Sequence, residues 1–382
     1  MNEKQNILIA PDSFKECADS VRIAEILKSE FQKRGFLATA SPVSDGGDGF
    51  LNVIKYYYKT ESVFTEVTSL TGKYKQKVEC AFSPESRIVF VESADVVGVK
   101  LVPPAQRYPL HFSSHGIGEL LLNLSKGSYV KGVKQSGEYC FDKVVIGIGG
   151  TAVIDFGLGA LSALGLKTID FYGKMINPLP DVLYKISGVV WNDPVLPFSL
   201  EFILDVKNPL LGNNGGIMTF GPQKGAKKAE LKVVELGVEK FCKLLKRKML
   251  IDSSENLPGA GGGIAAGLKI FLNAGLKYAE EFILNDLGVE KKLMEHNTII
   301  TGEGSFDIQS DMGKGAGIIL NEAAKFKKRV FLICGRFNGR IQHENVHVIE
   351  LKKYFSSEEE SMKNIKKALA LACGEIIDVI KP

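Results

Sequence analysis

Short apolar runs followed by polar, glycine-containing loops recur in the first part of the chain. Residues 6–10 have the apolar pattern of a short buried strand, and residues 38–43 form a second predicted strand. Between them, apolar residues three and four positions apart predict a helix that Asp19 caps and Gly35 ends. A further helix is predicted near residues 50–58. Strands that alternate with helices in this way predict a parallel sheet.

The same alternation returns near the C-terminus. Residues 298–301 form a predicted strand, followed by a polar loop and a predicted helix over 314–326. Residues 330–334 and 346–351 are further predicted strands, and 358–380 is a predicted closing helix. Because the two ends share this pattern, we expect them to form one α/β domain.

The middle of the chain has a different sequence pattern, in which the predicted β-rich segments are shorter. Its predicted strands are 63–70, 78–82, 88–91, 143–148 and 202–206, and its predicted helices are 157–164, 227–249 and 264–274. We therefore predict a discontinuous domain of residues 1–64 and 291–382, resembling Rossmann and flavodoxin folds. A mixed α/β domain of residues 65–290 is inserted into it.

Composition narrows the class of protein. The 382 residues are 45% hydrophobic and 24% charged, as in soluble globular proteins, and the net charge of +4 favours neither nucleic acid nor an anionic membrane as partner. The six cysteines form no C-x-x-C pair, which argues against a zinc or redox site. No run reaches the ~20 apolar residues that span a bilayer, and no apolar leader is seen. These features predict a cytoplasmic location.

Three polar side chains follow the first predicted strand. Asp12, Ser13 and Lys15 lie where open α/β sheets bind their ligands. Lys15 could neutralise a phosphate, and Ser13 could donate a hydrogen bond to one. An ordinary turn with local hydrogen bonds is an equally open alternative.

The loop after the second predicted strand reads S-D-G-G-D-G, with Asp45 and Asp48 on either side of Gly46 and Gly47. The carboxylates could hold Mg²⁺, or Asp45 could accept a proton from a substrate hydroxyl. Helix capping better explains Asp48, whereas a functional role is favoured for Asp45.

A third group follows the predicted strand 298–301. Here Gly302, Glu303 and Asp307 belong to the run T-G-E-G-S-F-D. Because the preceding strand is apolar and therefore buried, a ligand site is favoured over a bare turn.

The inserted domain has its own candidate anion site. Gly147, Gly149, Gly150 and Thr151 follow a predicted strand and could offer backbone N–H groups at the start of a helix. Asp155 lies one helical turn further on, where a capping role is the alternative.

Two further loops carry charged and amide side chains. Asp205, followed by Lys207 and Asn208, could coordinate a metal–phosphate group, although the residues also suit a turn. Gln223 and Lys224 lie in the G-P-Q-K-G loop, for which a solvated turn is the alternative.

Several known signatures are missing. The chain has no P-loop motif, no clean G-x-G-x-x-G after a strand, no H-E-x-x-H and no G-x-S-x-G. A nicotinamide-dependent oxidoreductase therefore fits the α/β pattern but lacks its fingerprint. The five histidines form no cluster, and His115 stands alone in a predicted glycine-rich turn.

Taken together, the motifs resemble those of the bacterial type I glycerate kinases. They read I-A-P-D-S-F-K-E, P-V-S-D-G-G-D-G, I-G-I-G-G-T-A, D-V-K-N-P-L-L-G-N-N-G, F-G-P-Q-K-G-A, P-G-A-G-G-G and I-T-G-E-G-S-F-D-I-Q-S, in the family's order and over nearly the full length. The resemblance implies two α/β domains, one inserted in the other, with the active site in the cleft between them. It also implies phosphorylation of D-glycerate by ATP with Mg²⁺.

The resemblance also implies roles for the candidate residues. Asp45 is the first choice to accept the hydroxyl proton and Asp12 the second, while Lys15 and Ser13 would orient the acid or the transferred phosphate. The segment 147–151 and Lys224 would bind phosphates, and Asp205 would hold Mg²⁺. The 2-hydroxyl is the favoured acceptor. A homodimer is also open.

This chain departs from the family pattern at several positions. His115 and Ser305 stand where the family has arginines, Ile154 where it has asparagine, and Phe156 where it has glycine. Neither histidine nor serine replaces the bidentate anion contact of an arginine. Another hydroxy-acid acceptor, or a non-catalytic binding protein, therefore stays open as an alternative.

Overall fold

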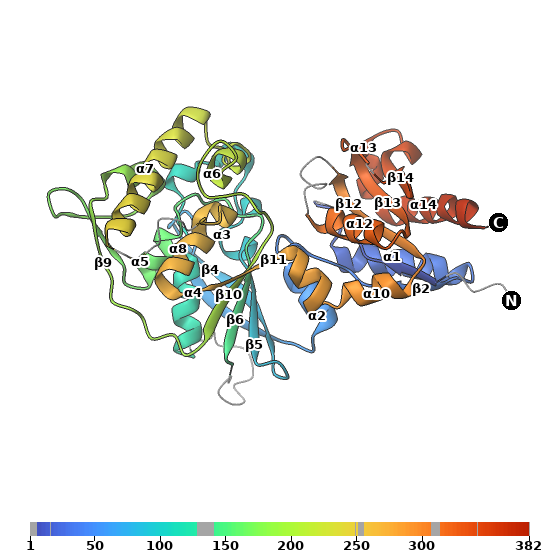
Figure 1. Ribbon diagram of the computed structural model, residues 1–382, viewed down its shortest axis with the longest axis horizontal. Helices are drawn as coiled ribbons and strands as arrows, with labels where there is room; N and C mark the ends of the chain where they lie inside the picture. The colour runs from blue at the N-terminus through green and yellow to red at the C-terminus, as the bar shows by residue number, and fades with distance from the viewer. Residues whose placement is uncertain are drawn as a thin grey trace. The chain divides into compact units, whose positions relative to one another are not determined.

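The chain folds into two compact units, each of which is an α/β structure. The computed structural model describes residues 6–15, 17–127, 141–248, 250, 256–306, 314–341 and 343–381. Met1–Tyr57 and Ala279–Pro382 form what we call the terminal unit, and Tyr58–Tyr278 form the inserted unit. Figure 1 draws the terminal unit in dark blue, orange and red. The inserted unit therefore begins after Tyr57 and ends at Tyr278. Both boundaries lie earlier in the chain than the predicted ones at residues 64 and 290.

The terminal unit is built on a five-stranded sheet in which neighbouring strands are parallel, in the order β14-β13-β12-β1-β2 (Figure 1). Its strands are β1 (Asn6–Ile9), β2 (Leu37–Ala40), β12 (Thr298–Phe306), β13 (Arg329–Phe337) and β14 (Val346–Glu350). Numbered along the chain, this is the order 2-1-3-4-5 of flavodoxin-like folds. The predicted flavodoxin-like parallel sheet is confirmed.

Helices cover both faces of the terminal sheet. On one face, α1 (Ser20–Lys33) and α14 (Ile365–Ile380) pack against Ile333 and its neighbours. On the other face, α12 (Gly315–Lys325) packs against Leu332. Consecutive residues of β13 thus enter different cores, because side chains alternate along a strand.

The predicted first helix is confirmed at both ends. Asp19 caps α1 by accepting a hydrogen bond from the Arg22 N–H at 2.8 Å. The chain then turns at Gly35, whose φ of 86° suits glycine. The helix α2 (Phe50–Tyr57) is confirmed as well.

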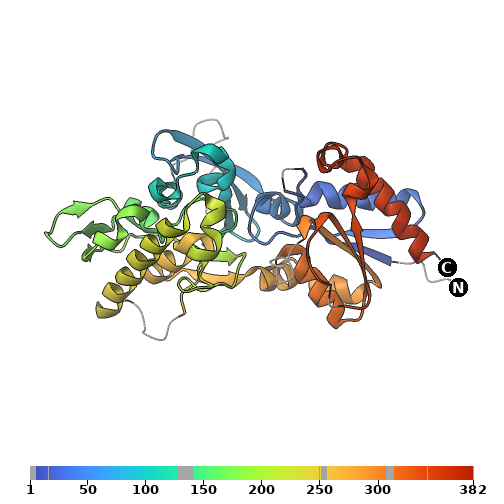
Figure 2. The same ribbon diagram turned by 90° about the horizontal axis from the view of Figure 1, so that it is seen from above.

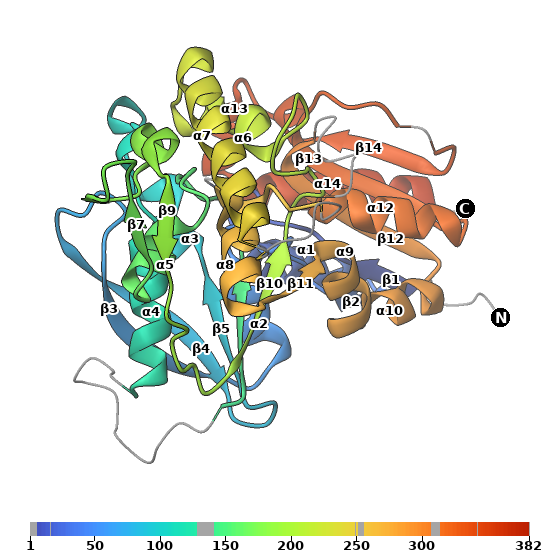
Figure 3. The ribbon, with the colours of Figure 1, turned by 60° about the vertical axis from the view of Figure 1, so that its left-hand side comes forward.

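The inserted unit is built on a six-stranded mixed sheet in the order β11-β10-β6-β5-β4-β3 (Figure 3). Its strands are β3 (Glu61–Thr68), β4 (Lys75–Ser83), β5 (Ile88–Glu92), β6 (Lys143–Gly147), β10 (Ser199–Leu204) and β11 (Gly275–Tyr278). The pairs β3–β4 and β4–β5 are antiparallel, and the others are parallel. The predicted mixed α/β character is confirmed.

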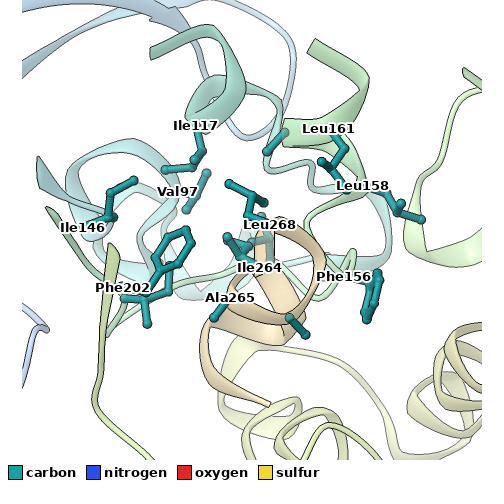
Figure 4. Packing of buried hydrophobic residues seen from close by; sticks show 14 of the residues in the cluster. Val97, Ile117, Ile146, Phe156, Leu158, Leu161, Phe202, Ile264, Ala265 and Leu268 are labelled. Atoms are coloured by element: carbon teal, nitrogen blue, oxygen red, sulfur yellow. The ribbon is translucent and has the colours of Figure 1, made fainter. Parts of the chain in front are cut away.

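A large apolar core joins this sheet to its helices. Ile146 of β6 and Phe202 of β10 face Ile117 of α4 (His115–Ser125), Leu161 of α5 (Leu158–Ala163) and Leu268 of α8 (Ile264–Leu272), as Figure 4 shows. All five side chains are fully buried. The core holds the loops that leave the carboxyl ends of β6 and β10.

A small antiparallel sheet lies beside this core. It has the order β8-β7-β9, formed by β7 (Lys167–Ile169), β8 (Met175–Ile176) and β9 (Gly188–Val190). In Figure 2 it forms the green, left-hand edge of the inserted unit. The long helix α7 (Lys228–Arg247) contacts η4 (Pro180–Lys185), the segment between β8 and β9.

Several predicted element boundaries are wrong. β2 ends at Ala40 and not at residue 43, because Pro42 has no backbone N–H to donate to a neighbouring strand. β12 continues to Phe306, because it pairs with β13 residue by residue past the expected end. The closing helix is divided at Asn364, where the backbone leaves the helical region between α13 (Glu358–Lys363) and α14.

Some elements were not predicted at all. They include α3 (Ala94–Val97), α4, α6 (Gly216–Phe220), α10 (Val289–Glu295), β7, β8, β9 and β11. Most are short, and the local apolar pattern is too brief to distinguish them from loops.

Candidate active site

The carboxyl ends of β1 and β12 meet in the terminal unit at the place where flavodoxin-like sheets bind ligands. These strands are neighbours in the sheet but not in the chain, and the helices that follow them cover opposite faces, which is the arrangement at the ligand edge of doubly wound sheets. Asp12 lies just beyond β1, and its N–H donates to the Gly302 carbonyl at 2.8 Å. The Thr301 hydroxyl donates to the Ala10 carbonyl at 2.8 Å. The two loops are thereby tied together.

Asp12 is a buried carboxylate in an unusual electrostatic environment. Burial raises its pKa well above the ordinary value, and repulsion from Asp45 and Glu303 raises it further. The Ser13 N–H, which donates to Asp12 Oδ1 at 2.6 Å, and the charge of Lys15 act in the opposite direction. The fold therefore brings together these residues, which lie on three separate segments of the sequence.

The start of α12 closes one side of the Asp12 carboxylate. A Cβ atom added at Gly315, the first residue of α12, would collide with Asp12 Oδ2. Only a residue without a side chain allows this approach. The carboxylate thus lies against the positive end of the helix dipole, an interaction that favours its charged form.

Asp45 sits in the turn that leads to α2. Its Oδ1 accepts a hydrogen bond from the Gly47 N–H at 3.0 Å, and Gly46 has a φ of 93° that suits glycine. The Val43 N–H donates to the Pro11 carbonyl at 3.0 Å, which ties this turn to the loop after β1. The local hydrogen bond is the turn contact considered as an alternative, and it leaves the second carboxylate oxygen for other contacts.

The third predicted group differs from its expected form. Gly302 and Glu303 lie inside β12, where Glu303 pairs with Cys334 of β13, and not in a loop. Ser305 is exposed and pairs with Arg336 of β13, whose guanidinium bonds Glu358 at 2.5 Å. Asp307 lies outside the described residues.

The segment 147–151 of the inserted unit is not a helix-start nest. Gly147 ends β6, while α5 begins at Leu158, close to the predicted start at residue 157, so the segment lies well before the helix and not at its start. The carbonyl of Gly149 accepts from the Ser93 hydroxyl at 3.4 Å, and that of Gly150 accepts from the Val99 N–H at 2.9 Å. Thr151 forms an isolated bridge with Gly98. These contacts fix an extended, well-anchored segment.

Lys224 reaches this segment from the inside of the unit. It lies in the short helix η5 (Pro222–Lys224), and its buried ammonium donates to Thr151 Oγ1 at 3.1 Å and to the Val153 carbonyl at 2.8 Å. Burial lowers the pKa of Lys224 to about 8, although Asp205 and Asp155 act in the opposite direction. The alternative of a solvated turn is therefore wrong for Lys224, whose side chain is buried.

Asp155 is fully buried and accepts hydrogen bonds from several donors. They are the Ser114 N–H at 2.7 Å, the Ser114 hydroxyl at 2.8 Å, and the Gly157 and Gly159 N–H groups at 3.1 Å. Burial raises the pKa of Asp155, and these hydrogen bonds lower it. The geometry matches the capping alternative, because Asp155 holds the starts of α4 and α5 together.

The remaining candidates are more peripheral. The Asn208 amide donates to the Asn214 carbonyl at 2.8 Å, and Gln223 is exposed. His115 begins α4 instead of lying in a turn, and its Nε2 is 3.6 Å from Glu119 Oε1. Asp205 follows β10 and interacts electrostatically with Lys224.

Sequence reasoning missed Ser114 and Gly315. The Ser114 hydroxyl donates a hydrogen bond to Asp155, and the lack of a side chain at Gly315 leaves room for the Asp12 carboxylate. The only local signals are a serine pair before His115 and a glycine-rich segment at the start of α12. Neither signal indicates which distant carboxylate it serves.

Within the described ranges no group of three or more His, Cys, Asp or Glu side chains is arranged to hold a metal ion. Mg²⁺ in phosphoryl-transfer enzymes commonly uses one or two carboxylates, with water and substrate phosphates as the other ligands. The repulsion among Asp12, Asp45 and Glu303 is the kind that a nearby cation relieves. These carboxylates are thus oxygen donors of the chemical type that Mg²⁺ binds.

Comparisons with known proteins give a consistent result. The sequence model described as the glycerate kinase family matches residues 7–381. Glycerate 2-kinase of Escherichia coli (strain K12) is 33% identical over 356 residues, covering 90% of this chain and 88% of that protein. Glycerate kinase of Haemophilus influenzae is 31% identical over 338 residues, covering 86% and 85%. The crystal structure of putative glycerate kinase 2 from Salmonella typhimurium LT2 has a TM-score of 0.74 and 28% identity, covering 98% of both chains.

Proposed function

Because this chain belongs to the glycerate kinase family, we propose that it transfers the terminal phosphoryl group of ATP to D-glycerate. The observation that carries the proposal is the family match over nearly the whole chain. As a member of this family, the protein is a phosphotransferase with an alcohol group as acceptor. The product we favour is 2-phosphoglycerate, in keeping with the name of the Escherichia coli relative.

In the terminal unit we propose that a carboxylate accepts the proton of the glycerate hydroxyl. The sequence favours Asp45, with Asp12 second. The raised pKa of Asp12 adds weight to Asp12, since a general base works best when its pKa approaches the working pH. Lys15, which is exposed at the same edge, would orient the acid or the transferred phosphate together with Ser13. Gly302 and Glu303 would line the same edge.

In the inserted unit we propose that the segment 147–151 and Lys224 bind phosphate oxygens, with Asn208, Gln223 and His115 as further binding residues. A phosphate beside Lys224 would favour its charged form and offset the effect of burial. Asp205 remains the proposed Mg²⁺ ligand. The ion, when bound, would supply charge neutralisation on the phosphates.

The departures from the family pattern fall into two kinds. Ile154 and Phe156 are fully buried, so these substitutions lie in the core. Phe156 has a φ of 58°, a region that glycine adopts more easily, and its ring lies 5.6 Å from that of Phe241. His115 and Ser305 are at least partly exposed and could alter anion binding. These two positions support the alternative of another hydroxy-acid acceptor, or of binding without turnover.

The test is release of ADP from Mg-ATP with and without D-glycerate, followed by identification of the product by NMR. Glycerate-dependent release with 2-phosphoglycerate as product supports the proposal. Phosphate at the 3-position would overturn the choice of hydroxyl alone. Thermal stabilisation by glycerate or ATP without turnover would favour the binding protein.

Variants distinguish the two candidate bases. Asp45→Asn and Asp12→Asn are compared with Asp378→Asn, which changes an exposed carboxylate of α14 in the same unit. Replacing the base should lower kcat by about 10²–10⁴-fold and remove the acidic limb of the pH profile. Asp378→Asn should keep normal kcat. Near-normal turnover in a candidate's variant would exclude that candidate.

Location and assembly complete the proposal. No helix in the part of the chain that the structure describes is long and apolar enough to cross a membrane. The described cysteines, Cys17, Cys80, Cys242, Cys334 and Cys373, are free thiols, which is consistent with the cytoplasmic location that we propose. We also propose that the protein forms a homodimer.

A further inference from the structure

The outer face of the small sheet in the inserted unit is mostly apolar although much of it is exposed, and Lys167 is its one charged position. Ile169 of β7 pairs with Met175 of β8 on one side and Gly188 of β9 on the other. A Cβ at Gly188 would contact the Ile169 side chain, so this side chain lies across β9. Val190 pairs with Lys167 at the end of the same strands. Met175 is 63% exposed and Val190 is 50% exposed.

Two exposed aromatic side chains lie at the β7–β8 turn, next to this face. Phe171 is 85% exposed and Tyr172 is 90% exposed, and their ring centroids lie 5.7 Å apart. The turn that carries them is well defined, because Asp170 Oδ1 accepts hydrogen bonds from the Tyr172 and Lys174 N–H groups, both at 2.9 Å. We call Ile169, Phe171, Tyr172, Met175 and Val190 the hairpin patch.

The two faces of this sheet differ in burial. Thr168 and Val189, which point the other way, are already buried in the unit. A sheet with one solvated face normally carries polar residues at the outward positions. Here the outward positions are Ile169, Met175 and Val190, with Gly188 between them and Lys167 at the edge.

We infer that the hairpin patch is the contact between two copies of this chain, and thus the surface of the homodimer proposed above. The area fits this occupant. Phe171 and Tyr172 expose on the order of 300–400 Å² together, and the aliphatic side chains add about 150 Å². If all of it is covered, two copies would bury about 1,000 Å², which is the lower limit for a biological interface and fits a dimer of modest affinity.

The polar rim also suits self-association. Asp170 and Lys174 flank the aromatic turn and carry opposite charges. A two-fold axis brings the same surface of both copies together, so a patch whose rim has both signs can pair with itself. Two copies of the small sheet would stack face to face through their apolar outer faces.

The test measures the mass of the full-length protein by analytical ultracentrifugation from about 1 to about 100 μM, a range that brackets micromolar affinity. Wild type should be dimeric at the upper end. Phe171→Glu and Tyr172→Glu should each weaken the dimer by at least about tenfold, because charge placed in an apolar contact must be desolvated. Phe171→Leu should retain most of the association. Met294→Glu, at a 52% exposed position of the terminal unit, is the matched control and should remain dimeric.

Hydrogen exchange of the wild-type protein provides a second measurement that requires no variant. Amides of residues 167–176 should exchange more slowly at high than at low protein concentration. A wild-type monomer throughout this range would overturn the inference, and so would a dimer that both glutamate variants leave intact. Glycerate-dependent ADP release, measured on the same samples, keeps failure of this interface distinct from failure of the proposed activity.

Discussion

The buried ammonium of Lys224 should make the stability of the inserted unit depend on pH in a defined direction. Burial lowers the pKa of Lys224 from 10.5 to about 8. A lowered lysine pKa means that the folded protein disfavours the charged form relative to the unfolded chain. The resulting loss of stability is fully present below about pH 8 and disappears as pH rises towards the unfolded value.

The magnitude follows from the size of the lowering. At ~1.4 kcal/mol per pH unit, the charged Lys224 costs about 3 kcal/mol near neutral pH. The linkage relation reduces this cost to about 2 kcal/mol near pH 9 and to about 1 kcal/mol near pH 10. Lys224→Met removes the charge but keeps most of the side-chain length. The difference in unfolding free energy, wild type minus Lys224→Met, should therefore rise by about 2 kcal/mol between about pH 7 and pH 10.

The chain offers a selective probe for this measurement. Trp191 is the sole tryptophan of the sequence and belongs to the inserted unit, as Lys224 does. Denaturant unfolding followed by tryptophan fluorescence therefore reports on the relevant unit. The hydrogen bonds that neutral Lys224 donates to Thr151 and Val153 add a constant cost to the variant, and the extra strength that the charge gives them is already contained in the pKa.

A matched control separates this effect from the general titration of lysines. Lys232→Met replaces an exposed lysine of α7 in the same unit. Its difference from wild type should stay constant over the same pH range. If Lys224→Met also gave a constant difference, the inward, desolvated position of Lys224 would be refuted. Saturating nucleotide should flatten the Lys224 profile if a phosphate binds beside it.

Two further predictions concern the carboxylates. Gly315→Ala should lower kcat at least about tenfold, because the new Cβ displaces the Asp12 carboxylate. Gly374→Ala, in an open position of α14, should be neutral or stabilise by up to about 1 kcal/mol in denaturant unfolding. Equal activity in both would contradict the placement of Asp12. Asp155→Asn should destabilise the inserted unit by about 2–4 kcal/mol in the Trp191 assay, since the amide faces Ser114 donors with one acceptor fewer. A loss under about 0.5 kcal/mol would argue against the capping role.

The sequence alone was sufficient for the class of fold and for the family. Short apolar runs that end in polar loops predict buried parallel strands, because period and length are local properties. Asp19 and Gly35 likewise mark the ends of α1 through local backbone chemistry. The ordered series of motifs also pointed to the glycerate kinases, whose family model matches residues 7–381.

Local patterns were less informative where pairing extends a segment. The glycines and polar residues after Thr301 resemble a loop, yet β12 continues through them because β13 supplies hydrogen-bond partners. Similarly, the glycines from Gly147 to Gly150 resemble a nest at a helix start, yet they are held by Ser93 and Val99 well before the helix that begins at Leu158. Tertiary pairing outweighs local propensity at such places.

Only the tertiary structure decided the state of the charged side chains. The pKa of Asp12 depends on Asp45 and Glu303, and its position on Gly315, all of which are distant in sequence. The inward position of Lys224 depends on acceptors on a different segment of its unit. Desolvation and Coulomb interactions depend on distance in space, so the same Asp or Lys can be a solvated turn residue, a cap or a perturbed acid or base. The sequence determines which chemical groups are present, and the fold determines how far each is buried and which charges lie near it.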